Sequence, residues 1–176
     1  MIASATGVVL PGVGAFGACM TALRSRGLET PTVGAAVGGR PFLGVCVGMQ
    51  MLFDGSEESP GVAGLGVVPG CVERMQGPTK LPQIGWNTVE ARAGSRLLAG
   101  LPDPPWLYFV HSYAAVPRSA EVVAGWSEYG GPFVAAIEAG PLWATQFHPE
   151  KSGAVGLALL ANFVRACTES EQEHDA

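Results

Sequence analysis

The sequence predicts an α/β fold, a single domain with a mixed, mainly parallel sheet flanked by helices. Helix-like and strand-like segments alternate over the first third of the chain, and short strand-like segments separated by turn residues fill the middle. Of the 176 residues, 48% are hydrophobic and only 14% are charged, which fits a buried parallel sheet or a sizeable partner interface. A chain of this length can bury a substantial core, and we expect the domain to span residues 1–167.

The first third of the chain predicts its elements in clear order. A strand over Gly7–Leu10 leads to a helix over Phe16–Arg26, which the next glycine ends. A short helix over Thr32–Val37 is broken by two glycines. An apolar strand over Phe42–Val45 follows, and the apolar residues after it predict a helix to about Phe53.

The rest of the chain is rich in strand-like segments and closes on a helix. A Gly/Ser/Glu/Pro-rich stretch over 54–64 predicts a surface loop. Ser95–Ala99 is expected to form a short helix, and Gly153–Ala166 the last helix, with apolar residues at core-facing spacings. The acidic, polar segment 168–176 predicts a disordered tail. The expected strands are Gly66–Pro69, Val72–Gln76, Asn87–Ala91, Trp106–Ala114, Val122–Ser127, Phe133–Glu138 and Leu142–Gln146.

The composition argues against several classes of function. The net charge is −5 and no basic cluster occurs, which argues against nucleic-acid binding. No apolar run reaches the ~18 residues of a membrane span, and the N-terminus lacks the features of a signal peptide. The four cysteines form no Cys-x-x-Cys pair and no zinc spacing, so they fit a reducing cytosol and a cytoplasmic protein. We expect Cys19 and Cys167 to be structural.

The stretch Gly44-Val45-Cys46-Val47-Gly48 is the most informative motif. It is a Gly-x-Cys-x-Gly sequence between an apolar strand and a helix, an arrangement that exposes a nucleophile on a sharp turn. The flanking glycines let the backbone bend without a Cβ clash. At a helix N-terminus, the thiolate form of Cys46 should be favoured. The alternative is a buried structural thiol.

A nucleophile of this kind needs a base, and the chain has three histidines. His174 lies in the expected tail, which leaves His111 and His148. His148 follows a strand-like run and stands two residues before Glu150, so the carboxylate can orient the imidazole while the other ring nitrogen faces Cys46. The sequence thus predicts a Cys46–His148–Glu150 triad, with His111 as the rival base. A surface histidine and a solvated glutamate are the alternatives.

These residues carry a family resemblance. The segments Gly44–Gln50 and Phe147–Glu150 resemble the class I, or triad, glutamine amidotransferases. One branch of that family is resembled more closely by two further segments. The first is Val8–Phe16, which contains Pro-Gly-Val-Gly. The second is Lys80–Asn87, together with the Phe-Val-His-Ser-Tyr stretch that ends at residue 113. The members of that branch are the glutaminase subunits that serve imidazole glycerol phosphate synthesis in histidine biosynthesis. The resemblance runs from about residue 8 to residue 164 and makes 1–167 a type-1 glutamine amidotransferase domain.

The resemblance implies a reaction and a set of substrate contacts. Cys46 would attack the side-chain amide of L-glutamine and release glutamate and ammonia without a cofactor or metal. The Val47 N–H and the backbone of the Gly12-Val13-Gly14 strand would form the oxyanion hole, the alternative being an ordinary Gly-rich turn. Gln50 would hold the α-amino acid end of the substrate. Backbone groups of Ser112 and Tyr113 would contact the same ligand.

The resemblance also implies a partner. The ammonia would pass to a (β/α)₈-barrel cyclase subunit in a heterodimer. Trp86, Tyr108 and Lys151 match positions that face this partner in relatives. For the two aromatic residues, packing in the core is the alternative.

The chain departs from the family pattern at its N-terminus. Relatives usually begin with a strand that carries Asp-Tyr-Gly-x-Gly-Asn and a helix, on the order of 30 residues, and this unit has no counterpart here. We therefore expect a sheet without its first strand–helix unit. Two alternative functions follow. One is another class I glutaminase, for anthranilate, GMP or pyridoxal phosphate synthesis, against which Gly85-Trp86-Asn87 and Phe109–Tyr113 argue. The other is an inactive partner-binding module.

Overall fold

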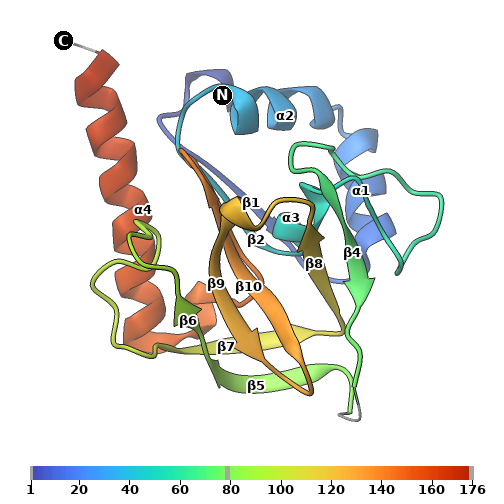
Figure 1. Cartoon of the computed structure of the whole chain (residues 1–176). Helices are drawn as coiled ribbons and strands as arrows, with labels where there is room; N and C mark the ends of the chain where they lie inside the picture. The colour runs from blue at the N-terminus through green and yellow to red at the C-terminus, as the bar shows by residue number, and fades with distance from the viewer. Residues whose placement is uncertain (1, 78–79, 175–176) are drawn as a thin grey trace.

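The computed structural model describes residues 2–77 and 80–174, which form two sheets and the helices around them (Figure 1). In the larger sheet of the described chain, the strands follow the order β1-β2-β11-β10-β8-β4-β3, with β9 added beside β10 and β6 beside β9. The smaller sheet pairs β5 with β7. The strands are β1 Val8–Gly12, β2 Phe42–Cys46, β3 Gly55–Ser56, β4 Gly70–Arg74, β5 Gln83–Thr88, β6 Glu90–Ala91, β7 Trp106–His111, β8 Tyr113–Pro117, β9 Val123–Glu128, β10 Pro132–Ala139 and β11 Leu142–Thr145.

The predicted mixed sheet between helices is confirmed, and its parallel part is the region that matters for the site. β1 pairs with β2, and β2 pairs with β11, both in parallel. Every residue of β2 and of β11 is buried, as expected for interior strands of a parallel sheet. β3 and β4 are also parallel, whereas β10 runs antiparallel to β8, β9 and β11.

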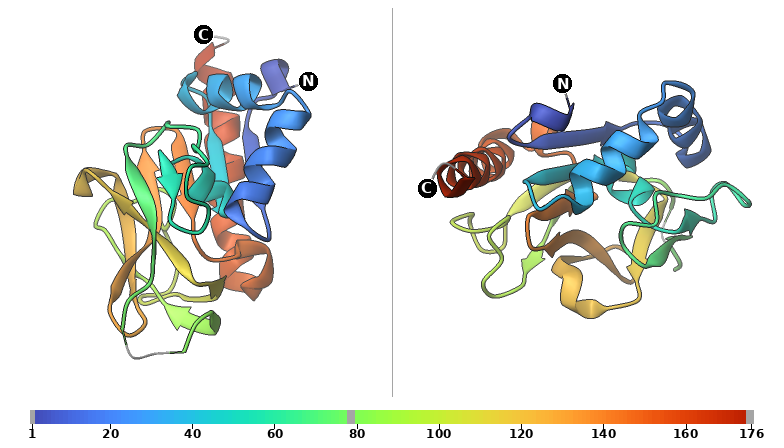
Figure 2. Two further views of the ribbon diagram at one scale, coloured as in Figure 1. Left: turned by 90° about the vertical axis from the view of Figure 1, so that its right-hand side faces the viewer. Right: turned by 90° about the horizontal axis from the view of Figure 1, so that it is seen from above.

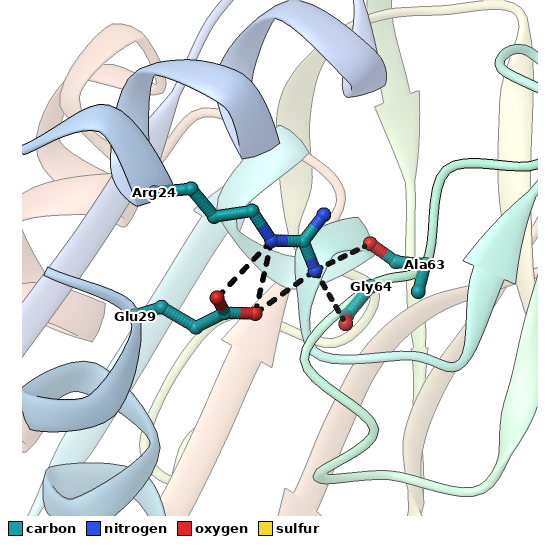
Figure 3. A network of polar contacts seen from close by, with 4 residues as sticks. All are labelled: Arg24, Glu29, Ala63 and Gly64. Carbon is teal, nitrogen blue, oxygen red and sulfur yellow. Dashed lines mark hydrogen bonds and ion pairs between the residues drawn. The ribbon is translucent and has the colours of Figure 1, made fainter. Parts of the chain in front are cut away.

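Two helices lie between β1 and β2 in the chain, and a third follows β2. They are α1 Phe16–Ser25, α2 Glu29–Val37 and the short α3 Val47–Met51. Arg24 at the end of α1 pairs with Glu29 at the start of α2, with 2.9 Å between Nη2 and Oε1 (Figure 3). The same guanidinium donates to the carbonyl oxygens of Ala63 and Gly64, so it ties both helices to the segment between β3 and β4.

The last helix, α4, runs over Gly153–His174 and lies along one side of the larger sheet (Figure 1). Leu159 and Phe163 face inward, and the Phe163 ring meets Trp143 of β11 edge to face at 6.1 Å. The helix includes most of the segment 168–176 that the composition predicts to be disordered. Its Glu and Gln residues are good helix formers, and Glu169 pairs with Arg96 at 2.5 Å, which anchors this part of the helix. Residues 175 and 176 lie outside the described residues.

Two predicted elements are absent from the described chain. Gly66–Pro69 forms bends and not a strand, because the N–H groups of Val67 and Val68 both donate to the Leu52 carbonyl. Ser95–Ala99 forms turns and not a helix. The Glu138 carboxylate accepts from the Ser95 hydroxyl and the Leu97 N–H, so side-chain contacts replace the helical bonding.

Two predicted strands are each divided in the structure. The expected strand 87–91 is split between β5 and β6, and the expected strand 106–114 between β7 and β8. At Ser112 the chain leaves the small sheet and enters the large one, because β7 pairs with β5 and β8 pairs with β4 and β10.

The β5–β7 sheet lies at one end of the molecule, and both chain ends lie at the other (Figures 1 and 2). Only one face of β7 is covered, since its buried residues alternate with partly exposed ones. None of the helices described, α4 included, is both long and apolar enough to cross a membrane.

Candidate active site

Cys46 sits on a strained bend between β2 and α3. Its backbone angles are φ 55° and ψ −114°, and among the described residues no other non-glycine residue has a positive φ. Strain of this kind is stored mainly at functional sites. The predicted glycine requirement is also visible, because a Cβ on Gly48 would overlap the Leu10 carbonyl oxygen. A Cβ on Gly44 would come within 3.1 Å of the Gly48 carbonyl oxygen. The chain therefore makes the sharp strand-to-helix turn, or elbow, that the Gly-x-Cys-x-Gly motif predicts.

The sheet register brings three chain segments together at the Cys46 end. Gly12 of β1 pairs with Cys46, and Thr145 of β11 pairs with Val45 on the other side of β2. Because the three strands are parallel, their carboxyl ends meet at one edge of the sheet. The segment after β1, the elbow after β2 and the Gln-Phe-His segment after β11 must therefore be neighbours.

His148 and Glu150 form the predicted imidazole–carboxylate pair. His148 precedes the 3₁₀ turn η3 Pro149–Lys151, and its ring Nδ1 lies 2.7 Å from Glu150 Oε1. The imidazole is buried, whereas the Glu150 side chain is 51% exposed. No hydrogen bond within the described chain occupies Nε2, so this nitrogen is available to accept a proton. Nor does a hydrogen bond within the described chain join the ring to the Cys46 thiol.

The small sheet holds the His148 turn in place. The His148 N–H donates to the Tyr108 carbonyl at 2.9 Å, and the Tyr108 N–H donates to Ser152 Oγ at 3.0 Å. The Ser152 hydroxyl in turn donates to the His148 carbonyl at 2.6 Å. Ser152 is buried and received no role from the sequence, although a serine just after a turn commonly bonds to the local backbone. The backbone position of His148 therefore depends directly on β7.

The prediction that the thiolate form of Cys46 is favoured is wrong for this structure. Cys46 is 5% exposed, and burial raises the pKa of its thiol to about 11. The Val47 N–H acts in the opposite direction, and Glu150 raises the pKa a little further. α3 has only five residues, so its dipole is small and burial dominates. At neutral pH the Cys46 side chain is therefore a neutral thiol.

The predicted oxyanion strand lies directly against the elbow. A Cβ on Gly12 would come within 2.9 Å of Val47 Cβ, so the glycine allows this close approach. Gly14 has φ +92°, a conformation that suits glycine, and Val13 between them is 76% exposed. The Val13 carbonyl accepts a hydrogen bond from the Cys19 thiol at 3.3 Å. Burial raises the pKa of the Cys19 thiol.

The residues predicted to hold the substrate are partly engaged within the protein. Gln50 of α3 is buried, and its Nε2 donates to the Tyr113 carbonyl at 3.1 Å and to Gln146 Oε1 at 3.0 Å. Its own Oε1 has no partner within the described chain and remains free to accept from a ligand. The Ser112 carbonyl accepts from the Met75 N–H at 3.0 Å. The carbonyl oxygens of Ser112 and Tyr113 are thus already occupied.

His111, the rival base, is buried with both ring nitrogens in hydrogen bonds. Nδ1 lies 2.9 Å from the Tyr113 carbonyl oxygen, and Nε2 lies 3.1 Å from Gln83 Oε1. Burial lowers the pKa of His111 to about 4. A ring that is held from both sides and resists protonation is poorly suited to act as a base for Cys46.

The three residues predicted to face a partner have accessible side chains. Trp86 of β5 is 52% exposed and meets the partly exposed Tyr108 of β7 edge to face, with ring centroids 5.9 Å apart. Lys151 is exposed and follows Glu150 directly. Packing of Trp86 inside the core is therefore excluded.

Within the described chain, no group of three His, Cys, Asp or Glu side chains is placed to hold a metal ion. A cavity of about 420 Å³ lies beside the predicted oxyanion strand and is lined by Gly12, Val13 and Cys19 among others. A second cavity, of about 700 Å³, lies between β4, β8, β9 and β10 and contains none of the triad residues.

A comparison with known protein families gives a match that fits the turn at Cys46, the imidazole–carboxylate pair and the mixed sheet. The family model described as "Glutamine amidotransferase class-I" matches residues 3–167. Since this match covers most of the chain, the chain belongs to the class I glutamine amidotransferases.

Closer relatives narrow this assignment. The chain is 53% identical over 164 residues to "Imidazole glycerol phosphate synthase subunit HisH" of Deinococcus radiodurans, which covers 92% of this chain and 76% of the relative. It is 48% identical over 157 residues to the HisH subunit of Desulfitobacterium hafniense, covering 89% of this chain and 74% of the relative. The chain is 48% identical to the HisH subunit of Methanothermobacter thermautotrophicus, and the match covers 93% of this chain and 81% of the relative. These similarities place the chain in the HisH branch of the family.

Solved structures support the fold. A glutamine amidotransferase crystal structure gives a TM-score of 0.67 at 20% identity and covers 93% of this chain and 79% of its own chain. A glutamine amidotransferase from Thermotoga maritima gives a TM-score of 0.62 at 20% identity, and the match covers 97% of this chain and 65% of that chain. At such identities the likeness shows the α/β fold and nothing more.

Proposed function

We propose that this chain hydrolyses L-glutamine to glutamate and ammonia and passes the ammonia to a cyclase subunit for imidazole glycerol phosphate synthesis in histidine biosynthesis. The observation that supports it best is the meeting of three segments at one sheet edge. These are a cysteine on a strained elbow, a histidine bonded at 2.7 Å to a glutamate, and a glycine strand against the elbow. The similarity to HisH subunits supports the same function.

The reaction needs a nucleophile, a base and donors for the developing oxyanion. The Cys46 sulfur attacks the γ-carboxamide carbon of glutamine while its proton moves to His148 Nε2. The C–N bond then breaks, and the imidazolium returns the proton to the leaving ammonia. A water molecule, deprotonated by the same ring, hydrolyses the thioester and releases glutamate. Glu150 orients the ring throughout.

The raised pKa of the Cys46 thiol decides how this reaction starts. A thiol with a pKa of about 11 is almost entirely protonated at neutral pH. Proton transfer to His148 must therefore accompany the attack, and oxyanion donors become essential. Each such donor is worth about 3–4 kcal/mol of barrier. The Val47 N–H and an N–H of the Gly12-Val13-Gly14 strand are the proposed donors, and a peptide flip in that strand would switch the site on.

The proposed partner is a (β/α)₈-barrel cyclase subunit that binds over Trp86, Tyr108 and Lys151. The exposed Trp86 ring supports an interface there, because large exposed aromatic residues are common anchors of protein interfaces. Tyr108 is bonded through its backbone to the His148 turn. A partner that moves β7 would thus move the proposed base as well.

One experiment separates this function from its alternatives. The purified chain is mixed with the cyclase subunit and glutamine, and glutamate release and cyclisation are measured. Glutamine-dependent cyclisation supports the proposal, whereas binding without turnover supports an inactive partner module. Turnover of glutamine without binding to the cyclase would indicate a glutaminase for another pathway.

The Cys46→Ala variant tests the nucleophile in the same assay. It should lose turnover and keep cyclase binding, because the elbow backbone remains. Cys71→Ala, at an exposed cysteine on β4, is the matched control and should keep full turnover. Normal turnover by Cys46→Ala contradicts the mechanism.

A further inference from the structure

Gln146 lies beside the nucleophile and has no role in the steps above. It follows β11 directly, is fully buried, and its N–H donates to the Ala135 carbonyl at 2.8 Å. Since Thr145, the last residue of β11, pairs with Val45, the residue after it stands next to Cys46. The Gln146 Nε2 lies 3.8 Å from the Cys46 sulfur, within hydrogen-bond range for sulfur.

The direction of the Gln146 carboxamide is fixed by a chain of buried contacts. The Tyr113 carbonyl can only accept, so the Gln50 amide must turn its NH₂ group toward it, at 3.1 Å. The second N–H of that group then donates to Gln146 Oε1 at 3.0 Å. With its oxygen occupied, Gln146 must present its own NH₂ group to the Cys46 sulfur. A backbone carbonyl thus sets the orientation of a donor two side chains away.

We propose that Gln146 is a positioning residue that donates an N–H to Cys46 and stabilises the sulfur as it loses its proton. The inference rests on the proposed use of Cys46 as a nucleophile. A hydrogen bond to a charged group is stronger than one to a neutral group, so the N–H favours the thiolate over the thiol. The amide carries no charge, so it provides this donor at any pH.

The surroundings of Cys46 explain why such a donor matters. Burial disfavours the thiolate, and Glu150 and Cys19 add negative potential. Lys151 and the Val47 N–H act in the favourable direction. A fully buried carboxamide is costly unless its groups are bonded, so a residue that only filled space here would be better apolar.

The test measures the reactivity of Cys46 without glutamine. The isolated chain is treated with iodoacetamide between pH 7 and pH 11, and alkylation of the Cys46 peptide is followed by mass spectrometry, which separates it from the other three cysteines. In Gln146→Met, which keeps the volume and removes the donor, the Cys46 rate at pH 8 should fall about tenfold, equal to a rise of about one pKa unit. In Gln146→Glu the alkylation rate of Cys46 should fall further, because this variant keeps an acceptor for Gln50 and places a carboxylate near the sulfur.

A matched control removes a buried carboxamide elsewhere. Asn162 of α4 donates to the Leu97 and Ala99 carbonyls, far along the chain from the elbow. Asn162→Leu should lower the thermal stability and leave the alkylation profile of Cys46 unchanged. Circular dichroism establishes that each variant is folded, and the isosteric Gln146→Glu keeps the test available where Gln146→Met does not fold. A wild-type alkylation profile in the folded Gln146 variants overturns the proposal.

A kinetic measurement with the cyclase subunit adds a second criterion. Gln146→Glu keeps the acceptor for Gln50, the proposed substrate-binding residue, and removes the donor to Cys46, so it should lower kcat at least tenfold and change KM less than about twofold. A large rise in KM with unchanged kcat would assign Gln146 to substrate binding and overturn the positioning role. The alkylation assay needs no turnover, so the two proposals can fail independently. If the chain does not hydrolyse glutamine but the alkylation rate of Cys46 still depends on Gln146, only the proposed function is refuted.

Discussion

Protonation of His111 should cost the fold much of its stability in mild acid. The ring is 6% exposed and packs against Phe109 and Phe133, with ring centroids 5.6 and 5.0 Å away. Burial lowers its pKa from 6.5 to about 4, although the hydrogen bond to Tyr113 acts in the other direction. A neutral ring has one N–H, which Nδ1 uses toward the Tyr113 carbonyl. Nε2 then needs a donor; Gln83 Oε1 lies 3.1 Å from it, and a half-turn of the Gln83 amide brings its NH₂ group to the same place.

The size of the effect follows from the two pKa values. The unfolded chain binds a proton at His111 near pH 6.5, whereas the folded protein does so only near pH 4. Between these values the unfolded state binds more protons, so stability is complete above pH 6.5 and falls as the pH drops toward 4. A difference of about 2.5 units corresponds to about 3 kcal/mol, of which about 2.5 kcal/mol is lost between pH 7.5 and pH 4.5.

Urea unfolding at pH 7.5, 6.5, 5.5 and 4.5 measures this loss. The control is His111→Asn, whose amide can still donate to the Tyr113 carbonyl but does not titrate. The carboxylates contribute to both proteins alike, so the wild type should lose about 2.5 kcal/mol more than the variant across this range. Parallel stability curves for the two proteins would refute the reasoning.

Two further predictions concern the elbow and the proposed interface. Gly48→Ala should destabilise the protein by about 1–3 kcal/mol in urea unfolding, because the new Cβ would overlap the Leu10 carbonyl and push β1 away from α3; an unchanged midpoint contradicts this packing. Trp86→Ala should weaken binding of the cyclase subunit about 30-fold or more in titration calorimetry, as expected for an interface anchor worth about 2 kcal/mol. Trp126→Ala, at a 42% exposed tryptophan on β9, is the control, and equal losses in both variants would rule out an interface centred on Trp86.

Much of the site could be predicted because its signals are local. Glycines on both sides of Cys46 indicate a sharp turn, and the strained φ of 55° shows that turn. His148 and Glu150 are two residues apart, so a short turn is enough to join them at 2.7 Å. Strand β2 was recognisable because it is an uninterrupted apolar run, as buried parallel strands require.

What the sequence did not reveal depends on contacts between distant segments. Gln146 ends the expected strand Leu142–Gln146, yet its contact with the Cys46 sulfur exists only because β11 lies beside β2. Ser152 acts through the backbone of Tyr108, 44 residues away. The division of the expected strand 106–114 at Ser112 likewise reflects a change of pairing partners, and local propensity carries no signal for it.

The protonation state of Cys46 shows why local signals alone can mislead. The position at a helix N-terminus was correctly predicted, and by itself it favours the thiolate. The structure adds a desolvated environment around the sulfur, and a helix of five residues cannot offset that burial. The thiol therefore stays protonated until a base accepts its proton. In the mechanism we propose, its activation comes from groups that act over short range, namely the Val47 N–H, the Gln146 carboxamide and the free nitrogen of His148. All three follow neighbouring parallel strands, so this mechanism makes the reactivity of Cys46 depend on the geometry at the sheet edge more than on the helix dipole.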